Sequence, residues 1–367
     1  MEEKDYYLAF SVSNIGPKRF QQLLKLFKSA KKAWEKSSAE KYNKVGIGKL
    51  TYAKFENFKK LFNFSVYRSK LQKAKVEFIP YASKLYPENL LKLSDPPIGL
   101  FVKGNQSLLL EKQTIAVVGA RKITIYGRQV TENLVSELCS AGFIIVSGMA
   151  LGVDGVGHKT AIENQGLTIA VLGCGVDCPY PRENEKLYKE ILDHNSLIIS
   201  EYPLGMLANK GTFPARNRII AGLSSSVLIT EAAEDSGSLI TADYAIKQGK
   251  TVFAVPGNVT SQMSKGSLKL LKQGATMVSS TQDILDTLNI KSHNASLARP
   301  RLAKLNGLKL SKSEQKILEV LKNEERTIDE ISKLTDIQMS RLSTTLSEME
   351  LEGLVRNLGG KFAVKNI

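Results

Sequence analysis

The sequence has 367 residues, which is too long for one compact hydrophobic core and predicts two or three domains. Its formal net charge of +15 points to a polyanionic partner, because a basic surface attracts phosphates. No stretch approaches the roughly 20 uninterrupted apolar residues of a membrane span, and residues 1–10 lack the basic-then-apolar order of a signal peptide. We therefore expect a cytoplasmic protein with no membrane partner.

Most of the excess positive charge lies near the N-terminus. Residues 1–75 contain 18 Lys and Arg but 6 Asp and Glu. The corresponding counts are 23 and 20 in residues 76–307, and 10 and 10 in residues 308–367. A phosphate-binding site beyond residue 75 must therefore be a local cluster. The N-terminal lysines have the alternative role of keeping the protein in solution.

Residues 1–75 are predicted to form a small helical domain, because their short apolar runs are broken by lysines and do not alternate. Gly16 and Pro17 precede a helical pattern, Phe20–Phe27. A Gly-Pro turn that exposes backbone N–H groups at a helix start can accept a phosphate. The segment resembles a SAM-like or helix-hairpin-helix unit.

Residues 76–291 alternate short β-branched runs with helical stretches. Apolar runs without alternation are typical of strands covered on both faces, and their alternation with helices predicts a parallel sheet. The expected fold class is α/β, an extended Rossmann-like doubly wound parallel sheet. The expected strands are Ile115–Val118, Phe143–Val146, Thr168–Leu172, Leu197–Ser200, Val227–Thr230, Thr251–Val255 and Ala275–Val278.

Residues 292–307 are polar and basic and are predicted to be a linker. Residues 308–367 follow the order of a winged helix: three helical patterns and a terminal hairpin. Thr327 and Glu330 form a capping box before the second helix, whose inward face we expect to include Leu334. The third helix is predicted from an apolar stripe that begins at Met339.

The loops that leave the strands carry the candidate site. In an open parallel sheet, ligands bind beyond the carboxyl ends of the strands, where loops enter helix N-termini. Small and hydroxyl-bearing residues there present clustered N–H groups and the positive end of a helix dipole, which suits phosphate. For Ser238 an ordinary helix N-cap is the alternative. The candidate phosphate-binding loop residues are Gly119, Gly148, Gly152, Ser236, Gly237, Ser238 and Thr241.

Arginines and one aromatic residue complete the candidate site. Arg121, Arg182, Arg216 and Arg218 lie in or beside these loops, and the 216/218 spacing suits successive phosphates of one strand. The alternative for Arg216 and Arg218 is internal pairing with a carboxylate, for which the candidates are Glu201, Glu231 and Asp243. Phe213, like Tyr126, Tyr180 and Tyr202, has the chemistry to stack on a base, although about half of such residues simply belong to the core.

Several kinds of site are not indicated. No GxGxxG follows the first strand of the α/β segment and no GxxxxGK[ST] occurs, so neither NAD nor ATP is implied and no cofactor is expected. Cys139, Cys174 and Cys178 form no CxxC pair and have no histidine at ligand spacing, which favours reduced core thiols over a metal site.

The ordered motifs together resemble the DNA-processing protein A family, DprA or Smf. The resemblance covers about residues 80–290. One departure is Ala120, where family members usually carry a serine, so a hydroxyl donor is missing from the first loop. The motifs are Tyr86-Pro87, Pro96-Pro97, Gly119-Ala120-Arg121, Ser147-Gly148, Gly152-Val153-Asp154, Tyr180-Pro181, Ser200-Glu201, Phe213-Pro214-Ala215-Arg216-Asn217-Arg218, Ser236-Gly237-Ser238 and Pro256-Gly257-Asn258.

The resemblance implies a non-enzymatic protein that binds single-stranded DNA in a basic pocket of a Rossmann domain and delivers it to RecA during natural transformation. The phosphate contacts that it implies fall on residues already named and on Lys265. It also implies a homodimer formed through the C-terminal part of this domain. We place the interface on Leu268 and Leu271 in a helix over 267–273; their alternative role is to cover the sheet.

Two other functions compete. A phosphoribohydrolase of the lysine-decarboxylase-like type would need a Pro-Gly-Gly-x-Gly-Thr loop, whereas residues 235–243 lack the Gly-Gly pair and offer only Asp243 as the acid. A transcription regulator would act through its winged helix, but residues 308–367 carry no net charge. A binding assay separates the regulator from the single-stranded DNA-binding protein: the regulator should prefer a fixed duplex sequence, and the other protein should prefer single strands.

Overall fold

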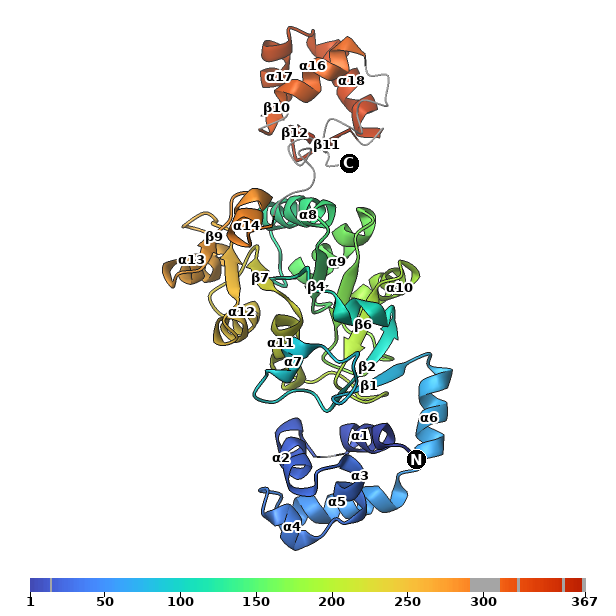
Figure 1. The fold of residues 1–367 in the computed structure, drawn as a ribbon. Helices are drawn as coiled ribbons and strands as arrows, with labels where there is room; N and C mark the ends of the chain where they lie inside the picture. Colours follow the sequence, from blue (N-terminus) through green and yellow to red (C-terminus); the bar gives the residue numbers. More distant parts are fainter. Residues whose placement is uncertain (14, 291–310, 322–323, 352–353, 365–367) are drawn as a thin grey trace. The chain divides into compact units, whose positions relative to one another are not determined.

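The computed structural model describes residues 1–13, 15–290, 311–321, 324–351 and 354–364 (Figure 1). The chain forms two compact units, residues 1–291 and 292–367. The predicted linker, 292–307, lies outside the described residues. In the described part of the chain, no helix is both long enough and apolar enough to cross a membrane.

The N-terminal segment is helical, as its broken apolar runs predict. Its core is aromatic: the ring of Phe10 stacks on Phe55 at 5.4 Å between centroids, and Trp34 meets both edge-on. Gly16 is the N-cap of α2, with Pro17 at its first position. The helices are α1 (Glu3–Val12), α2 (Pro17–Phe27), α3 (Ala30–Glu35), α4 (Ala39–Asn43), α5 (Lys49–Leu61) and α6 (Phe64–Lys73).

These helices pack on the sheet that follows. Leu8 and Leu71 share a buried cluster with Phe101 of the sheet, and Tyr67 accepts a hydrogen bond from the backbone N–H of Leu204. The helical segment and the sheet therefore belong to one compact unit. We keep a boundary at residue 75 as an interpretation, because the aromatic core of the helices is a cluster of its own.

The sheet has the strand order β1-β2-β6-β5-β4-β3-β7-β8-β9. The strands from β6 to β9 run parallel, whereas β1 and β2 add an antiparallel pair that the sequence analysis did not anticipate. The strands are β1 (Glu77–Pro80), β2 (Gly99–Gly104), β3 (Thr114–Val118), β4 (Ile144–Ser147), β5 (Thr168–Val171), β6 (Leu197–Ser200), β7 (Ser226–Ile229), β8 (Thr251–Ala254) and β9 (Thr276–Met277).

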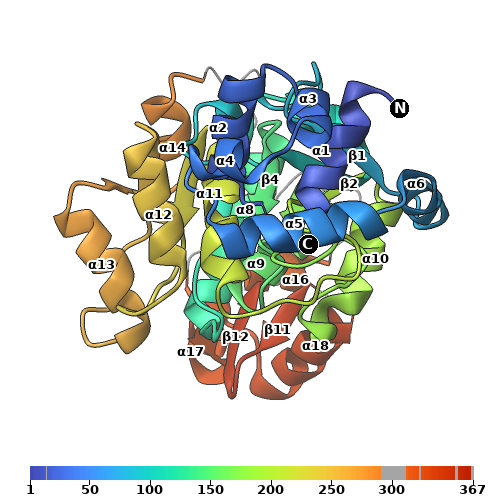
Figure 2. The same cartoon turned by 90° about the horizontal axis from the view of Figure 1, so that it is seen from below.

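Helices cover both faces, so the predicted doubly wound α/β fold is confirmed. Helices α11 and α12 pack on the face formed by Ala116 and Val118, while α9 lies against Val117 and Ile145 on the other. In Figure 2, α12 and α13 lie toward the left and α10 lies toward the right, near β1 and β2. The helices of this part are α7 (Glu88–Leu91), α8 (Ile125–Ser140), α9 (Val153–Glu163), α10 (Glu185–Asp193), α11 (Thr212–Leu223), α12 (Ser238–Lys247), α13 (Lys265–Lys272) and α14 (Thr281–Thr287), with 3-10 turns η1 (Gln106–Leu110), η2 (Arg182–Asn184) and η3 (Gln262–Ser264).

The second unit has the predicted winged-helix order. Thr327 and Glu330 form the capping box of α17. Leu334 was expected to face inward but is 56% exposed, and Met339 at the start of α18 is 42% exposed. The elements are α16 (Lys312–Val320), β10 (Arg326–Thr327), α17 (Ile328–Thr335), α18 (Met339–Leu351), β11 (Val355–Asn357) and β12 (Lys361–Val364).

Candidate nucleic-acid interface

The loops with candidate site residues leave the carboxyl ends of adjacent parallel strands. Strand β3 is central; β4, β5 and β6 follow on one side and β7 and β8 on the other. The winding direction reverses at β3, which is the place where open α/β sheets bind ligands. The loops that meet at this edge are 119–124 after β3, 148–152 after β4, 172–181 after β5, 201–211 after β6 and 230–237 after β7.

The loop after β3 is anchored by Glu231. The backbone N–H of Ala120 donates to the Glu231 carbonyl at 2.7 Å, and the N–H and hydroxyl of Thr124 donate to the Glu231 carboxylate at 2.9 and 2.6 Å. Thr124 is also the N-cap of α8. The anion-attracting start of α8 therefore already carries a carboxylate, whereas Arg121 and Lys122 between the anchors are exposed.

Gly119 and Gly152 allow this loop to lie against α9. A Cβ on Gly152 would lie 2.1 Å from the Ala120 carbonyl oxygen, and Gly152 has a φ of +75°. A Cβ on Gly119 would lie 2.5 Å from the Glu231 carbonyl oxygen. Both glycines are thus required by close backbone packing, whether or not a phosphate also approaches them.

Arg216 lies beneath the edge instead of on it. Its side chain is 4% exposed and donates to the Gly148 carbonyl at 2.7 Å, to the Val171 carbonyl and to Asn217. A Cβ on Gly148 would lie 2.7 Å from Arg216 Nη2 and 2.8 Å from Asp154 Oδ2. Burial lowers the pKa of Arg216, against the opposing effect of Asp154. The expectation that Arg216 meets a phosphate directly is corrected: it joins the ends of β4 and β5 from inside.

Arg218 is also internal, which is the alternative that the sequence left open. Its guanidinium donates to both carboxylate oxygens of Glu201 at 2.6 Å and to Asp95 Oδ2 at 3.1 Å, and its side chain is 4% exposed. Burial opposes the charge, but Glu201 raises the pKa of Arg218 above its usual value. Arg218 therefore stabilises the fold and presents no free donor at the edge.

An exposed aromatic and cationic cluster remains. The rings of Tyr180 and Phe213 lie 5.4 Å apart at 37°, and Arg121 Cζ lies 5.4 Å from the Phe213 centroid. Tyr180 comes from the loop after β5, Arg121 from the loop after β3 and half-buried Phe213 from the first turn of α11; Tyr180 is 48% exposed. Arg182 is exposed two residues after Tyr180. Rings of this kind stack on bases, while the arginines attract phosphates.

The start of α12 is open at Gly237. Ser236 and Ser238 share a hydrogen bond of 2.8 Å between their hydroxyls, and a Cβ on Gly237 would meet nothing within 4 Å. No acidic residue lies in the first turn of α12. Thr241 is buried and turns inward. The start of α8 holds Glu231 and the first turn of α9 contains Asp154, whereas α12 has no acidic residue in its first turn, which suits an incoming anion.

Lys265 and the dimer candidates lie on α13. Lys265 is exposed at the first position of that helix, and the next residue, Gly266, donates its N–H to the Ala232 carbonyl at 2.8 Å. This hydrogen bond places the backbone of Lys265 next to the loop that contains Ser236. Leu268 and Leu271 are half-buried, with Leu271 packed against the core.

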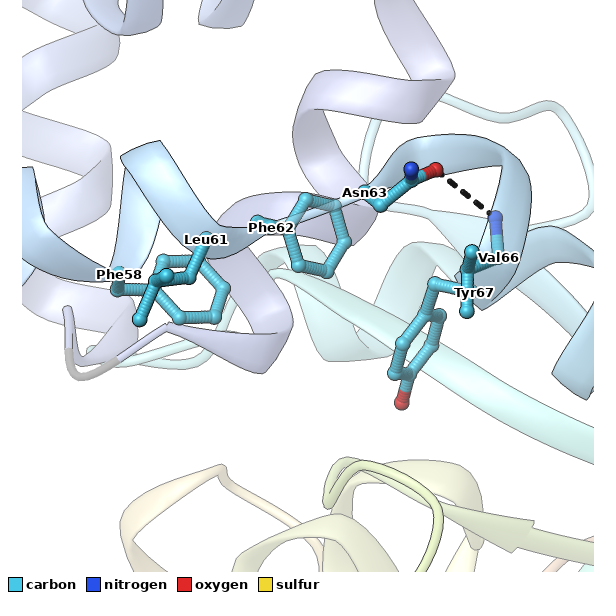
Figure 3. Close-up of a pocket in the computed structure, with 6 residues that line it drawn as sticks. All are labelled: Phe58, Leu61, Phe62, Asn63, Val66 and Tyr67. Carbon is cyan, nitrogen blue, oxygen red and sulfur yellow. Dashed lines mark hydrogen bonds between the residues drawn. The ribbon is translucent and has the colours of Figure 1, made fainter.

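Cys174 and Cys178 also lie in the loop after β5, but the described residues offer no candidate metal site there. Cys139, Cys174 and Cys178 are free thiols, and the described residues hold no group of three or more His, Cys, Asp or Glu that could bind a metal. A hollow of about 260 Å³ lies between α5 and α6, lined mainly by apolar side chains (Figure 3). Its lining does not suit a phosphate. The lining residues are Phe58, Leu61, Phe62, Asn63, Val66 and Tyr67.

Sequence reasoning missed three features of this edge. It weighed Glu231 only as a partner of an arginine, not as the anchor of Thr124. It did not select Lys122 or Lys210, which are exposed beside Arg121 and Phe213. A search for cations adjacent to the selected residues would have found both lysines; nothing local to Glu231 marks its role.

Comparison with known proteins agrees with this architecture. The family model for DNA recombination-mediator protein A matches residues 77–289, and a DprA winged helix domain model matches residues 303–361. The chain is 44% identical to DNA processing protein DprA of Bacillus subtilis, over 58% of this chain and 71% of the relative. It is 41% identical to Protein Smf of Escherichia coli, over 61% of this chain and 59% of that relative.

Two solved structures are similar. The DprA structure from Streptococcus pneumoniae matches with a TM-score of 0.68 and 32% identity, over 77% of this chain and 97% of that one. The DNA processing protein A structure from Helicobacter pylori, whose title concerns its single-stranded DNA binding mode, matches with a TM-score of 0.54 and 35% identity, over 60% and 98%. With its sheet, edge loops and C-terminal unit matched in this way, the chain belongs to the DNA recombination-mediator protein A family.

Proposed function

We propose that this chain binds single-stranded DNA at the carboxyl edge of its sheet and loads RecA onto it, in the cytoplasm, during natural transformation. The cluster of exposed Arg121, exposed Tyr180 and half-buried Phe213 carries the proposal, because it combines aromatic rings that can stack on bases with a cation. The open start of α12 at Gly237 and the exposed cations Arg182 and Lys265 extend the surface that a phosphate chain would follow.

Arg121→Ala tests this proposal. Losing one charged contact should weaken binding to dT oligomers about ten- to a hundredfold, since such contacts contribute about 1.5–3 kcal/mol. The slope of log affinity against log salt should become shallower by about 0.7, because one fewer phosphate is neutralised. The matched control is Lys189→Ala, which removes an exposed cation on α10. Equal affinities of Arg121→Ala and the control would place the DNA elsewhere.

Binding without hydrolysis is part of the proposal. The buried carboxylates at the edge are already engaged: Glu231 with Thr124, Asp154 with the Gly148 N–H at 3.0 Å and Glu201 with Arg218 at 2.6 Å. None of these carboxylates is free to act as a general acid or base on a nucleotide. Release of ribose phosphate from a nucleoside monophosphate by the purified protein would refute this part.

We further propose a homodimer formed through α13, by Leu268 and Leu271. Leu270 is 3% exposed and belongs to the core, whereas Leu268 and Leu271 lie at its boundary. Exposed Met277 on β9 adds an apolar side chain to the same end of the sheet. Leu271→Asp should shift sedimentation from dimer to monomer; a monomeric unmutated protein at micromolar concentration would contradict the proposal.

The RecA step is proposed from the resemblance to the family and has its own test. The protein should speed the onset of DNA-dependent ATP hydrolysis by RecA on strands already covered by a single-strand-binding protein. Arg121→Ala should lose this effect together with DNA affinity. If the protein does not change the onset, then its function is limited to covering single strands.

A further inference from the structure

Glu231 is a buried residue whose hydrogen bonds tie it to the loop after β3. It follows β7, its residue is 3% exposed, and among the described residues no Lys or Arg forms an ion pair with it. Its side chain instead accepts the N–H and the hydroxyl of Thr124, 107 positions earlier in the chain. A buried charge needs such compensation, which the start of α8 supplies through directed donors and its dipole.

The contacts of Glu231 close a ring around Arg121. The main-chain carbonyl of Glu231 accepts the N–H of Ala120, and its carboxylate holds Thr124, so both ends of the segment 120–124 are fixed to one residue. From the other side, the Ala120 carbonyl accepts the N–H of Val153 at 3.1 Å. The exposed Arg121 is therefore carried on a loop whose ends do not move independently of β7 and α9.

We propose that Glu231 is a positioning residue for single-strand binding: it holds the loop so that the Arg121 guanidinium lies over the Phe213 ring. This inference rests on the proposed function of Arg121. The 5.4 Å distance from Arg121 Cζ to the Phe213 centroid is the geometry that the anchored loop produces. Without the carboxylate, residues 121–124 lose one of their two attachments to β7, and the cation is presented in many orientations.

Two effects of removing this charge oppose each other, so an experiment distinguishes them. A carboxylate near a polyanion repels it, and neutralising Glu231 would strengthen DNA binding if charge alone mattered. Losing the anchor would weaken DNA binding. Because the carboxylate is compensated by the donors of Thr124, we expect the loss of the anchor to dominate.

The test uses the full chain and dT oligomers. Glu231→Gln keeps the shape but cannot accept both Thr124 donors, and it should weaken binding about three- to thirtyfold, which is part of the Arg121→Ala effect. Glu163→Gln, which removes an exposed carboxylate on α9, is the charge control and should bind as the unmutated protein does. Amide hydrogen exchange of 121–124, measured without DNA, should be faster in Glu231→Gln.

The double variant Arg121→Ala/Glu231→Gln identifies the route of the effect. If Glu231 acts through Arg121, then the double variant binds within about twofold of Arg121→Ala alone. The inference would be overturned if the affinity losses of the two single variants multiply in the double variant, or if Glu231→Gln binds DNA as tightly as the unmutated protein or more tightly. Either result leaves the proposed site intact. Normal binding by Arg121→Ala would overturn both.

Thr124→Val covers the case in which Glu231→Gln does not fold. It removes the hydroxyl that donates to Glu231 at 2.6 Å and leaves the carboxylate in the chain. It should reproduce the faster exchange at 121–124 and the weaker binding. The inference would also be overturned if Thr124→Val folds and both its amide exchange at 121–124 and its DNA affinity equal those of the unmutated protein.

Discussion

Arg218→Ala separates a structural arginine from a DNA-binding one. The guanidinium and its partner Glu201 are buried, with side chains 4% and 9% exposed, and they are joined by two bonds of 2.6 Å. Removing one member of a buried pair leaves an uncompensated charge and costs about 3–5 kcal/mol. At roughly 2–3 °C per kcal/mol for a unit of this size, the melting temperature should fall by about 6–15 °C.

The assay is a thermal melt beside a binding titration on the same preparation. Affinity for dT oligomers, measured well below the melting transition, should stay within about twofold of the unmutated protein. Glu201→Gln is the companion variant and should destabilise less, because Arg218 keeps its contact with the half-exposed Asp95. An unchanged melt together with a tenfold loss of affinity would refute the structural assignment of Arg218.

Two further predictions concern buried groups and glycines. Burial lowers the pKa of His158 to about 3, so between that pH and its ordinary 6.5 the unfolded chain binds a proton that the folded chain does not. Stability should therefore fall as the pH drops below 6.5, by about 2 kcal/mol at pH 5, and His158→Asn should flatten this dependence in urea titrations. Gly148→Ala should lower the melting temperature, because its Cβ would contact Arg216 and Asp154. Gly237→Ala has open space and should leave the melt unchanged; weaker DNA binding by this variant would indicate close approach of a phosphate, and unchanged binding would remove Gly237 from the interface.

Much of the parallel sheet could be predicted from the sequence because its strands are short, apolar and buried on both faces. The run Leu197–Ser200 has the same bounds in the structure, and the others differ by a residue at one or both ends. The antiparallel pair β1 and β2 was not anticipated. Its first strand, Glu77–Pro80, is four residues long and pairs with residues about 20 positions later, so no local period marks it.

The candidate site was less predictable, because burial of a charged side chain depends on distant acceptors. Arg216 and Arg218 look alike in the sequence, yet one donates to carbonyls 68 and 45 positions earlier and the other to a carboxylate 17 positions earlier. Only the fold shows that neither guanidinium is exposed. In contrast, exposed Arg121 lies in the loop after β3 and half-buried Phe213 lies at the start of α11, both of which the strand pattern alone places at the carboxyl edge.

The Glu231 carboxylate occupies the donors of Thr124 at the start of α8, and the Asp154 carboxylate occupies the Gly148 N–H in the loop after β4. Because they are part of the chain, each meets its donors at a high effective concentration, which a dissolved nucleotide must overcome to take its place. A polynucleotide that lies along Arg121 and Phe213 does not need those donors. We therefore expect free nucleotides to compete weakly at this edge, while its outer surface stays available to a polymer.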